Sequence, residues 1–274
     1  MFNKNSMFFY PLLLLFSLII SGCEKTDDSV EIQFALTYDD AAFSCDHKFV
    51  VDGLAWQLSQ LQFYISEIEV KDARNNWQSA SIEVESSVEE ITAAENPTTA
   101  KTTTSSSVAL MGGICGQAQT WQVNLASPIA RGAIRGLKFT LGVPQHLNHL
   151  NPLTQPSPLN QSDMFWTWQL GYKFVRMELA SPNHQWIFHL GSTGCQSASP
   201  VRPPEAPCLF PNRPTIVLDN FTFENTIALD LSALLKDIKL SQDNSCQSAQ
   251  ELALCQRLFE RVGISNTQQI FKVL

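Results

Sequence analysis

Apolar and polar residues alternate with a period of two over several segments of this 274-residue chain. Ile32, Phe34 and Leu36 alternate with polar or small residues, and the same period runs through residues 61–70. Successive side chains of a strand point to opposite faces, so this alternation predicts strands with one buried face. Further strand-like runs are predicted at residues 136–143, 165–179, 185–190 and 215–218.

A convincing helical pattern occurs only near the end of the chain. There the apolar residues recur at steps of three and four, at Leu252, Cys255, Leu258, Phe259 and Val262. This spacing places them on one face of a helix. Residues 230–240 are expected to add a short helical turn.

The balance of these elements predicts an all-β protein. The strands are joined by turn-rich segments at residues 144–161 and 197–214. We therefore expect an antiparallel Greek-key β-sandwich with long loops and a short C-terminal helix. Residues 31–274 are assigned to a single domain. Residues 94–107, rich in Thr, Ser and Ala, are assigned to a mobile insertion, and residues 241–274 to a helical C-terminal extension.

The N-terminus has the organisation of an export signal. Lys4 precedes an apolar run at residues 7–20, and Ser21 and Gly22 precede Cys23. The run is shorter than the roughly 20 residues that a spanning helix needs. Residues 18–23 also have the form of a bacterial lipobox. We expect residues 1–22 to be removed, Cys23 to be lipidated, and residues 23–30 to tether the domain to the outer membrane. The alternative is an ordinary signal peptide with a chance cysteine.

Net charge and cysteine content narrow the class of protein to which the mature chain can belong. Lys4 is the only charge within residues 1–22, so the mature chain carries 17 basic and 26 acidic residues. This net charge of −9 argues against nucleic-acid binding. Six cysteines remain besides Cys23, an even number that predicts disulfides in an exported protein. Fifteen connectivities are open, and we favour Cys45–Cys115, Cys195–Cys208 and Cys246–Cys255.

The candidate chemistry lies in the second half of the chain. Signatures of hydrolases, phosphate-binding loops and zinc peptidases are missing, so we do not expect an enzyme. Instead, four of the five histidines fall within residues 146–189, together with Met164, Trp166 and Trp168. Imidazole and thioether groups suit copper in an oxidising compartment. From spacing alone, a histidine in an apolar strand is more often a hydrogen-bonded core residue, and the two tryptophans are by default rings packed on one sheet face.

Several phrases of the sequence together resemble the MbnP-like family, the four-cysteine member of the metallo-mystery pair. They are FYIS at 63–66, LGVP at 141–144, LNH at 147–149, PLN at 158–160, MFWTWQLGYKF at 164–174 and FHLGSTGC at 188–195, with Cys208 and PNR at 211–213. The resemblance runs from about residue 30 to about residue 235. This chain departs from the pattern in its additional pair, Cys246 and Cys255.

The resemblance implies a β-sandwich that binds copper through histidines, as in related surface proteins of methane-oxidising bacteria. It also implies a di-haem partner similar to bacterial cytochrome c peroxidases, which in some members oxidises a tryptophan to kynurenine. Carried onto this chain, the first ligand candidates are His149 and His189, with His47 and Met164 as weaker candidates. Trp166 and Trp168 are the candidates for oxidation.

Two other functions stay open at this point. One is a metal-free binding or adhesion module of the cell envelope, whose tryptophans pack in the core or contact a carbohydrate or protein. The other is a copper enzyme, which would need an open coordination position and a bound reducible substrate.

Overall fold

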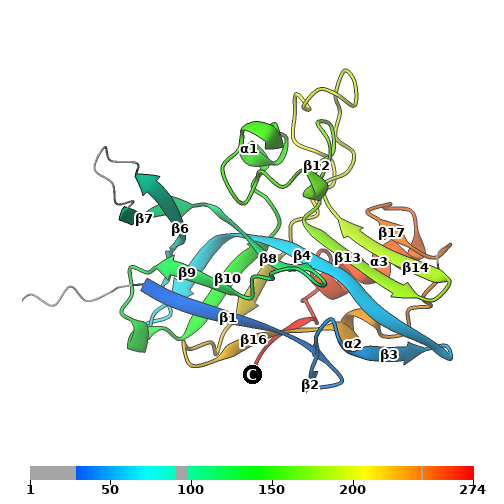
Figure 1. Ribbon diagram of the computed structural model, residues 1–274, viewed down its shortest axis with the longest axis horizontal. Coiled ribbons are helices and arrows are strands. Elements are labelled where there is room, and N and C mark those ends of the chain that lie inside the picture. The colour runs from blue at the N-terminus through cyan, green and yellow to red at the C-terminus, as the bar shows by residue number, and fades with distance from the viewer. Residues whose placement is uncertain (1–28, 91–97, 242) are drawn as a thin grey trace, which may run out of the picture.

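The computed structural model of the chain describes residues 29–90, 98–241 and 243–274. Cys23, the signal segment and most of the expected tether lie outside the described residues, since the first strand begins at Ser29. Two large sheets make up most of the molecule (Figure 1). No helix in the described part of the chain is long and apolar enough to cross a membrane.

The first sheet has seven strands. Its order is β18 (Phe271–Val273), β16 (Thr226–Asp230), β1 (Ser29–Tyr38), β9 (Gln122–Ala126), β6 (Ser81–Glu90) and β7 (Thr98–Ser106), and β2 (Ala41–Ala42) pairs with β1.

The second sheet has nine strands, arranged around the long strand β4. Its order is β15 (Thr215–Leu218), β10 (Gly136–Leu141), β4 (Leu54–Lys71), β13 (Val175–Ser181), β14 (His184–Leu190) and β17 (Cys246–Gln247), and β3 (Lys48–Val51), β5 (Trp77–Ser79) and β8 (Val108–Ile114) also pair with β4.

Aromatic rings from both sheets meet in the core. Phe34 of β1 lies 6.0 Å, between ring centroids, from both Phe63 of β4 and Phe139 of β10. Phe271 of β18 contacts the same two rings. The predicted alternation in β1 therefore points one row of side chains at the second sheet, and the all-β, sandwich-like class is confirmed. Two strand pairs, β1 with β16 and β14 with β17, are parallel, so the sheets are mixed and not purely antiparallel.

The remaining elements are short. They are the hairpin of β11 (Phe165–Thr167) and β12 (Gly171–Tyr172), the helices α1 (Gln145–Asn148), α2 (Leu231–Leu235) and α3 (Ala253–Val262), and the 3-10 turns η1 (Arg131–Ala133), η2 (Pro152–Thr154) and η3 (Ser162–Met164). Helix α3 buries Cys255, Leu258, Phe259 and Val262 of the predicted apolar face, whereas Leu252 precedes the helix and is exposed. The helix ends at Gly263, which adopts the left-handed conformation (φ +99°) typical of a helix C-terminus.

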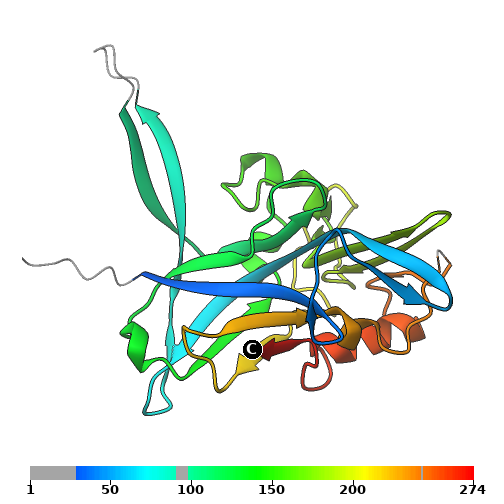
Figure 2. The same cartoon turned by 60° about the horizontal axis from the view of Figure 1, so that its bottom comes forward.

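Three predicted segments differ from expectation. Residues 165–179 are not one strand but β11, β12 and the first part of β13. Residues 98–106, assigned to a mobile insertion, form β7 and pair with β6 in a hairpin that projects from the body (Figure 2). Its Thr and Ser residues offer little apolar surface to bury, but Thr in particular is compatible with a strand. The C-terminal extension is not simply helical, because β17 and β18 add strands to both sheets.

The three disulfides have the predicted pairing. Cys45 pairs with Cys115, Cys195 with Cys208, and Cys246 with Cys255. The last bond joins β17, at the edge of the second sheet, to helix α3. It therefore ties the C-terminal segment to the sandwich.

Candidate metal centre

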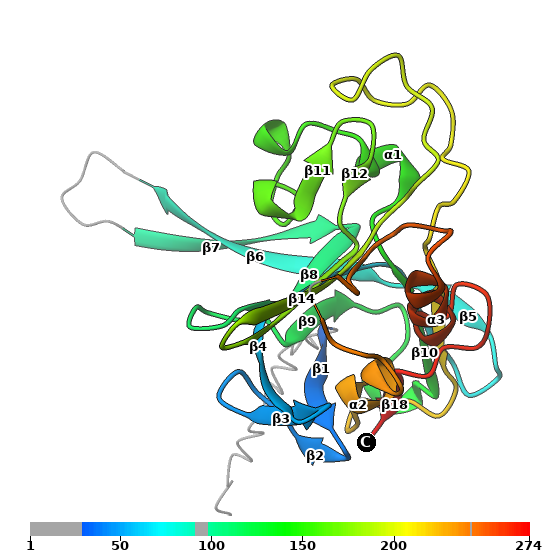
Figure 3. The same ribbon diagram turned by 90° about the vertical axis from the view of Figure 1, so that its right-hand side faces the viewer.

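His149 lies at the end of α1, in the cluster of loops above the second sheet (Figures 1 and 3). Its side chain is buried, with 7% of its surface exposed. Nδ1 lies 3.2 Å from the carbonyl oxygen of Trp168. A carbonyl oxygen only accepts, so Nδ1 carries the hydrogen and Nε2 keeps a lone pair. Burial lowers the pKa of His149, although the bond to Trp168 opposes part of this shift. The lowered pKa favours the neutral ring.

Asn148 fastens this loop to the sheet. Its buried Oδ1 accepts a hydrogen bond from the backbone N–H of Tyr172 at 2.9 Å. Its Nδ2 donates to Oγ of Ser192 at 3.3 Å and lies 3.3 Å from Nε2 of His149. Gly171 has φ +77°, and any Cβ there would overlap Asn148. The close approach of β12 to α1 therefore requires glycine at this position.

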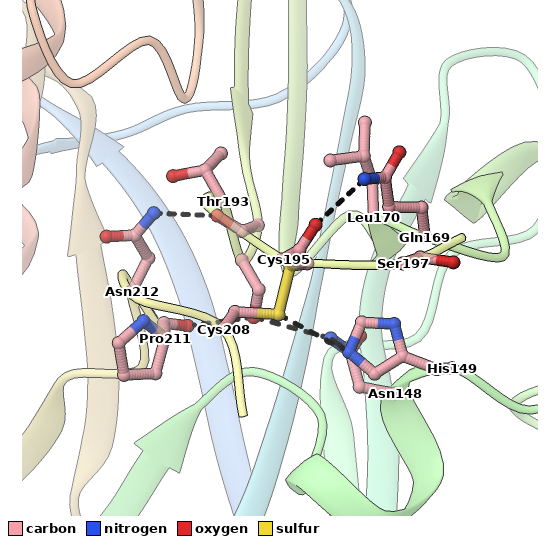
Figure 4. Close-up of a disulfide and its surroundings, with 12 residues drawn as sticks. Asn148, His149, Gln169, Leu170, Thr193, Cys195, Ser197, Cys208, Pro211 and Asn212 are labelled. Atoms are coloured by element: carbon pink, nitrogen blue, oxygen red, sulfur yellow. Dashed lines mark hydrogen bonds between the residues drawn. A yellow bond between two sulfur atoms is a disulfide. The ribbon is translucent and has the colours of Figure 1, made fainter. Parts of the chain in front are cut away.

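The Cys195–Cys208 disulfide packs against the same histidine (Figure 4). Nε2 of His149 lies 3.6 Å from Sγ of Cys208. Within the described residues, these three side chains are the one group of at least three His, Cys, Asp or Glu whose ligand atoms lie within 4.8 Å of one another. Both sulfurs are bonded to each other and are not thiolates, the form that binds metals. In this state, His149 is the only strong ligand of the group.

His189 lies in β14, on the second sheet. Its Nε2 is 3.2 Å from Oε1 of Glu178, on the neighbouring strand β13. The same oxygen accepts from Nε of Arg176 at 2.7 Å. The bond from His189, together with Arg176, outweighs burial and lowers the pKa of Glu178 to about 2. Glu178 is therefore an ionised acceptor at neutral pH, and Nε2 of His189 carries the hydrogen.

The other nitrogen of His189 is left with a lone pair. Nδ1 is buried and has no hydrogen-bond partner among the described residues. Burial lowers the pKa of His189 and outweighs the bond to Glu178, and Lys173 and Arg176 add to the lowering. A buried polar atom without a partner calls for an explanation, and a bound metal ion is one that suits a neutral imidazole.

Trp166 and Trp168 lie on the hairpin that passes both histidines. The ring centroid of Trp166 is 6.3 Å from that of His189, and its edge packs on Gly191 so closely that no Cβ would fit there. Trp168 contacts His149 through its backbone carbonyl, while its ring packs edge-on against Phe165. Trp166 is therefore the tryptophan whose ring lies against a histidine with a free nitrogen.

His47 and Met164 have different surroundings. His47 is exposed in the segment between β2 and β3, where Nδ1 lies 2.9 Å from Oγ of Ser44. That segment is at the opposite end of the molecule from α1 (Figure 3), so the structure does not bring His47 to the other histidines. Met164 is fully buried in the hydrophobic core, just before the hairpin.

Asn148 and Glu178 were not singled out from the sequence. Glu178 lies two residues after Arg176 and so shares its face of β13, but its partnership with His189 depends on the register between β13 and β14. Asn148 precedes His149 directly, yet nothing local indicates that its amide would join three segments. The proximity of His149 to the Cys195–Cys208 disulfide was likewise not expected.

Comparison with known proteins places these features in a family. The family model of MbnP matches residues 27–248. Among solved structures, MbnP from Methylosinus trichosporium is similar, with a TM-score of 0.72 and 24% sequence identity, over 89% of this chain and 97% of that chain. At this identity the match shows a shared fold. No curated protein matches the sequence significantly.

Proposed function

Because the chain belongs to the MbnP family, we propose that it is a non-catalytic copper-binding protein of the cell envelope, with His149 and His189 as ligands. The observation that carries this proposal is shared by the two histidines. Each has one ring nitrogen fixed by an oxygen acceptor and a lone pair on the other nitrogen. In His189 this nitrogen has no partner among the described residues, whereas in His149 it faces Nδ2 of Asn148 at 3.3 Å, a contact that a metal would replace. Metal-binding histidines have this arrangement, because the acceptor orients the ring and raises its basicity.

The donor set suits copper. Both rings are buried, and both have pKa values below the ordinary value, so the neutral form required of a ligand is favoured at neutral pH. Imidazole is a common ligand of copper. The protein's part is to orient the two rings, through the Trp168 carbonyl on one side and the Glu178 carboxylate on the other.

A di-haem, peroxidase-like protein is the partner that we propose for this chain. Trp166 would be its substrate, because the intact indole N–H offers no lone pair to a metal whereas the aniline nitrogen of kynurenine does. The loops of the site also present exposed apolar side chains, Leu153, Val201 and Leu209, which are 82%, 74% and 72% exposed. A lipid on Cys23 would keep this chain at the membrane.

Copper titration of matched variants tests the ligand assignment. His189→Ala and His149→Ala are each expected to lower copper affinity by more than about 100-fold, since even partners of metal ligands contribute 10- to 100-fold. The controls are His184→Ala, at the exposed start of the same strand, and His146→Ala, exposed in α1. Affinity is measured by competition with a chromogenic chelator. Equal affinity in all four variants would disprove the assignment.

Mass spectrometry of protein purified from its host tests the partner. A peptide containing Trp166 that has gained two oxygens and lost one carbon monoxide would support tryptophan oxidation. Bound copper with unmodified tryptophans would retain the histidine site and remove the oxidation step. Protein with neither copper nor modification would favour the metal-free binding module.

A further inference from the structure

We propose that reduction of the Cys195–Cys208 disulfide creates a second, thiolate-containing site for monovalent copper, made of Cys195, Cys208 and His149. The inference rests on the proposed function only in its use of copper and of His149. The disulfide state of the loop would then decide whether His149 binds copper with nitrogen ligands or with sulfur ligands.

The spacing of the ligand atoms fits a metal. A closed-shell ion such as zinc lies about 2.3 Å from a thiolate sulfur and about 2.0 Å from an imidazole nitrogen. At angles of about 110–120°, these bond lengths place the two ligand atoms about 3.5–3.7 Å apart. Sγ of Cys208 already lies 3.6 Å from Nε2 of His149. Sγ of Cys195 completes the group within 4.8 Å, so breaking the sulfur–sulfur bond needs only local movement to make three ligands.

The backbone beneath the disulfide would hold the two cysteines together after reduction. Thr193 and Phe210 exchange two backbone hydrogen bonds, of 2.9 and 3.0 Å, just outside the cysteine pair. The N–H of Leu209 also donates to the carbonyl of Gly194. Nδ2 of Asn212 donates to the carbonyl of Gly191 at 2.8 Å (Figure 4). The site is therefore pre-organised by contacts that do not involve the sulfur atoms.

A reductant can reach the bond by local opening. The two cysteines are buried, but the loop between them, residues 196–207, is exposed along most of its length. Its side-chain hydrogen bonds are largely internal, from Oγ of Ser197 to the carbonyls of Ser199 and Arg202. A segment with so few contacts to the core opens at low free-energy cost.

The redox step balances with a dithiol reductant, such as a thiol–disulfide oxidoreductase. The dithiol transfers two electrons and two protons to the disulfide, which becomes two thiols, while the dithiol becomes a disulfide. Binding of monovalent copper then displaces both thiol protons to solvent. Thiolates select monovalent copper, and three ligands without a fourth fit this ion better than zinc, whose structural sites are tetrahedral.

The test compares the oxidised and reduced forms of the mature protein. After treatment with a dithiol and its anaerobic removal, differential alkylation maps the free cysteines, and copper is added as its monovalent acetonitrile complex. X-ray absorption then reports sulfur or nitrogen neighbours of copper. We expect copper–sulfur scattering only once Cys195 and Cys208 are free, with at least tenfold tighter binding than in the oxidised form.

Matched variants separate this site from the other cysteines. Cys195→Ser with Cys208→Ser should lose the sulfur signal, whereas Cys246→Ser with Cys255→Ser and Cys45→Ser with Cys115→Ser should keep it. His149→Ala should keep sulfur neighbours and weaken binding. Reduced wild-type protein with Cys195 and Cys208 free but no sulfur neighbour would overturn the inference, whether or not the variants fold.

The same series keeps the inference distinct from the proposed function. Copper with nitrogen neighbours in the oxidised protein, and no sulfur after reduction, would leave the proposed function standing and remove the thiolate site. If the oxidised protein bound no copper and the reduced protein bound copper with sulfur neighbours, the thiolate site would stand and the proposed function would fall.

Discussion

His149 stands at the end of a four-residue helix among loops, whereas His189 stands inside a strand of the nine-stranded sheet. The backbone of His189 is aligned with Arg176 on one side and Gln247 on the other. The backbone of His149 has no such ladder, and its position depends on Asn148 and the Trp168 carbonyl, with the disulfide packed against its ring. The sheet therefore positions one histidine through many shared backbone bonds, and a few side chains position the other. The loop half of the site, around His149, and the sheet half, around His189, should therefore respond differently to single substitutions.

The largest effect is expected for Asn148→Ala, in the loop half. It leaves the buried N–H of Tyr172 without its acceptor and removes the N–H that Asn148 donates to Ser192, whose hydroxyl still donates to the carbonyl of Pro211. We expect a loss of about 2–4 kcal/mol in the free energy of unfolding, measured with urea. Asn160→Ala, at an exposed loop position, is the control and should change it by less than about 0.5 kcal/mol. Equal effects would show that Asn148 does not hold the loop.

Gly191→Ala tests the sheet half. The new Cβ would overlap the Trp166 ring and lie 2.8 Å from the carbonyl oxygen of Tyr172, so the ring must move. We expect destabilisation by about 1–3 kcal/mol and altered tryptophan fluorescence. Gly132→Ala, where nothing lies within 4 Å of the added atom, is the control. Unchanged fluorescence and stability in Gly191→Ala would mean that Trp166 does not pack there.

Glu178→Gln sharpens the comparison at His189 alone. The amide is neutral and no longer orients His189 as a strong acceptor, while Arg176 keeps its ion pair with Asp163 at 2.9 Å. Copper affinity is expected to fall by about 10- to 100-fold, with little change in stability. Glu251→Gln, at an exposed site, serves as the control for loss of one negative charge. An affinity as high as in the wild type would exclude Glu178 as the group that orients His189.

The smallest effect is a pH dependence of the metal-free protein. Burial holds the pKa values of His149 and His189 below the ordinary value of 6.5 in the fold. Below this pH the unfolded chain binds more protons than the folded chain, so the free energy of unfolding should fall as the pH is lowered. His149→Gln and His189→Gln should each flatten this slope, whereas His184→Gln should not. Identical slopes in all three would contradict the assignment of buried, neutral rings.

Much of the architecture could be predicted from local pattern. The period-two alternation located β1 and part of β4, strand-like runs located β10, β14 and β15, and the period of three and four located α3. The even number of cysteines indicated disulfides, and the favoured pairing is the one observed. These features could be predicted because the spacing of apolar residues along a short segment indicates the buried face of a strand or helix.

What escaped prediction depends on residues far apart in the chain. The run at 165–179 contains many aromatic and apolar residues that favour strands, yet Gly171 lets the chain turn against Asn148 and divides it. The parallel pairs of β1 with β16 and of β14 with β17 join segments that are far apart in the chain, and β15, β16 and α2 lie between β14 and β17. Local periodicity contains no information on such pairing.

The sequence by itself determined the class of fold, the presence of disulfides, the family and the two histidines worth testing. Only the tertiary structure decided what surrounds those histidines. It brought Glu178 to His189 through strand register, and Trp168 and a disulfide to His149 through loop packing. The reason is that a side chain's chemistry is local, whereas the orientation and protonation of an imidazole are set by neighbours that folding brings together.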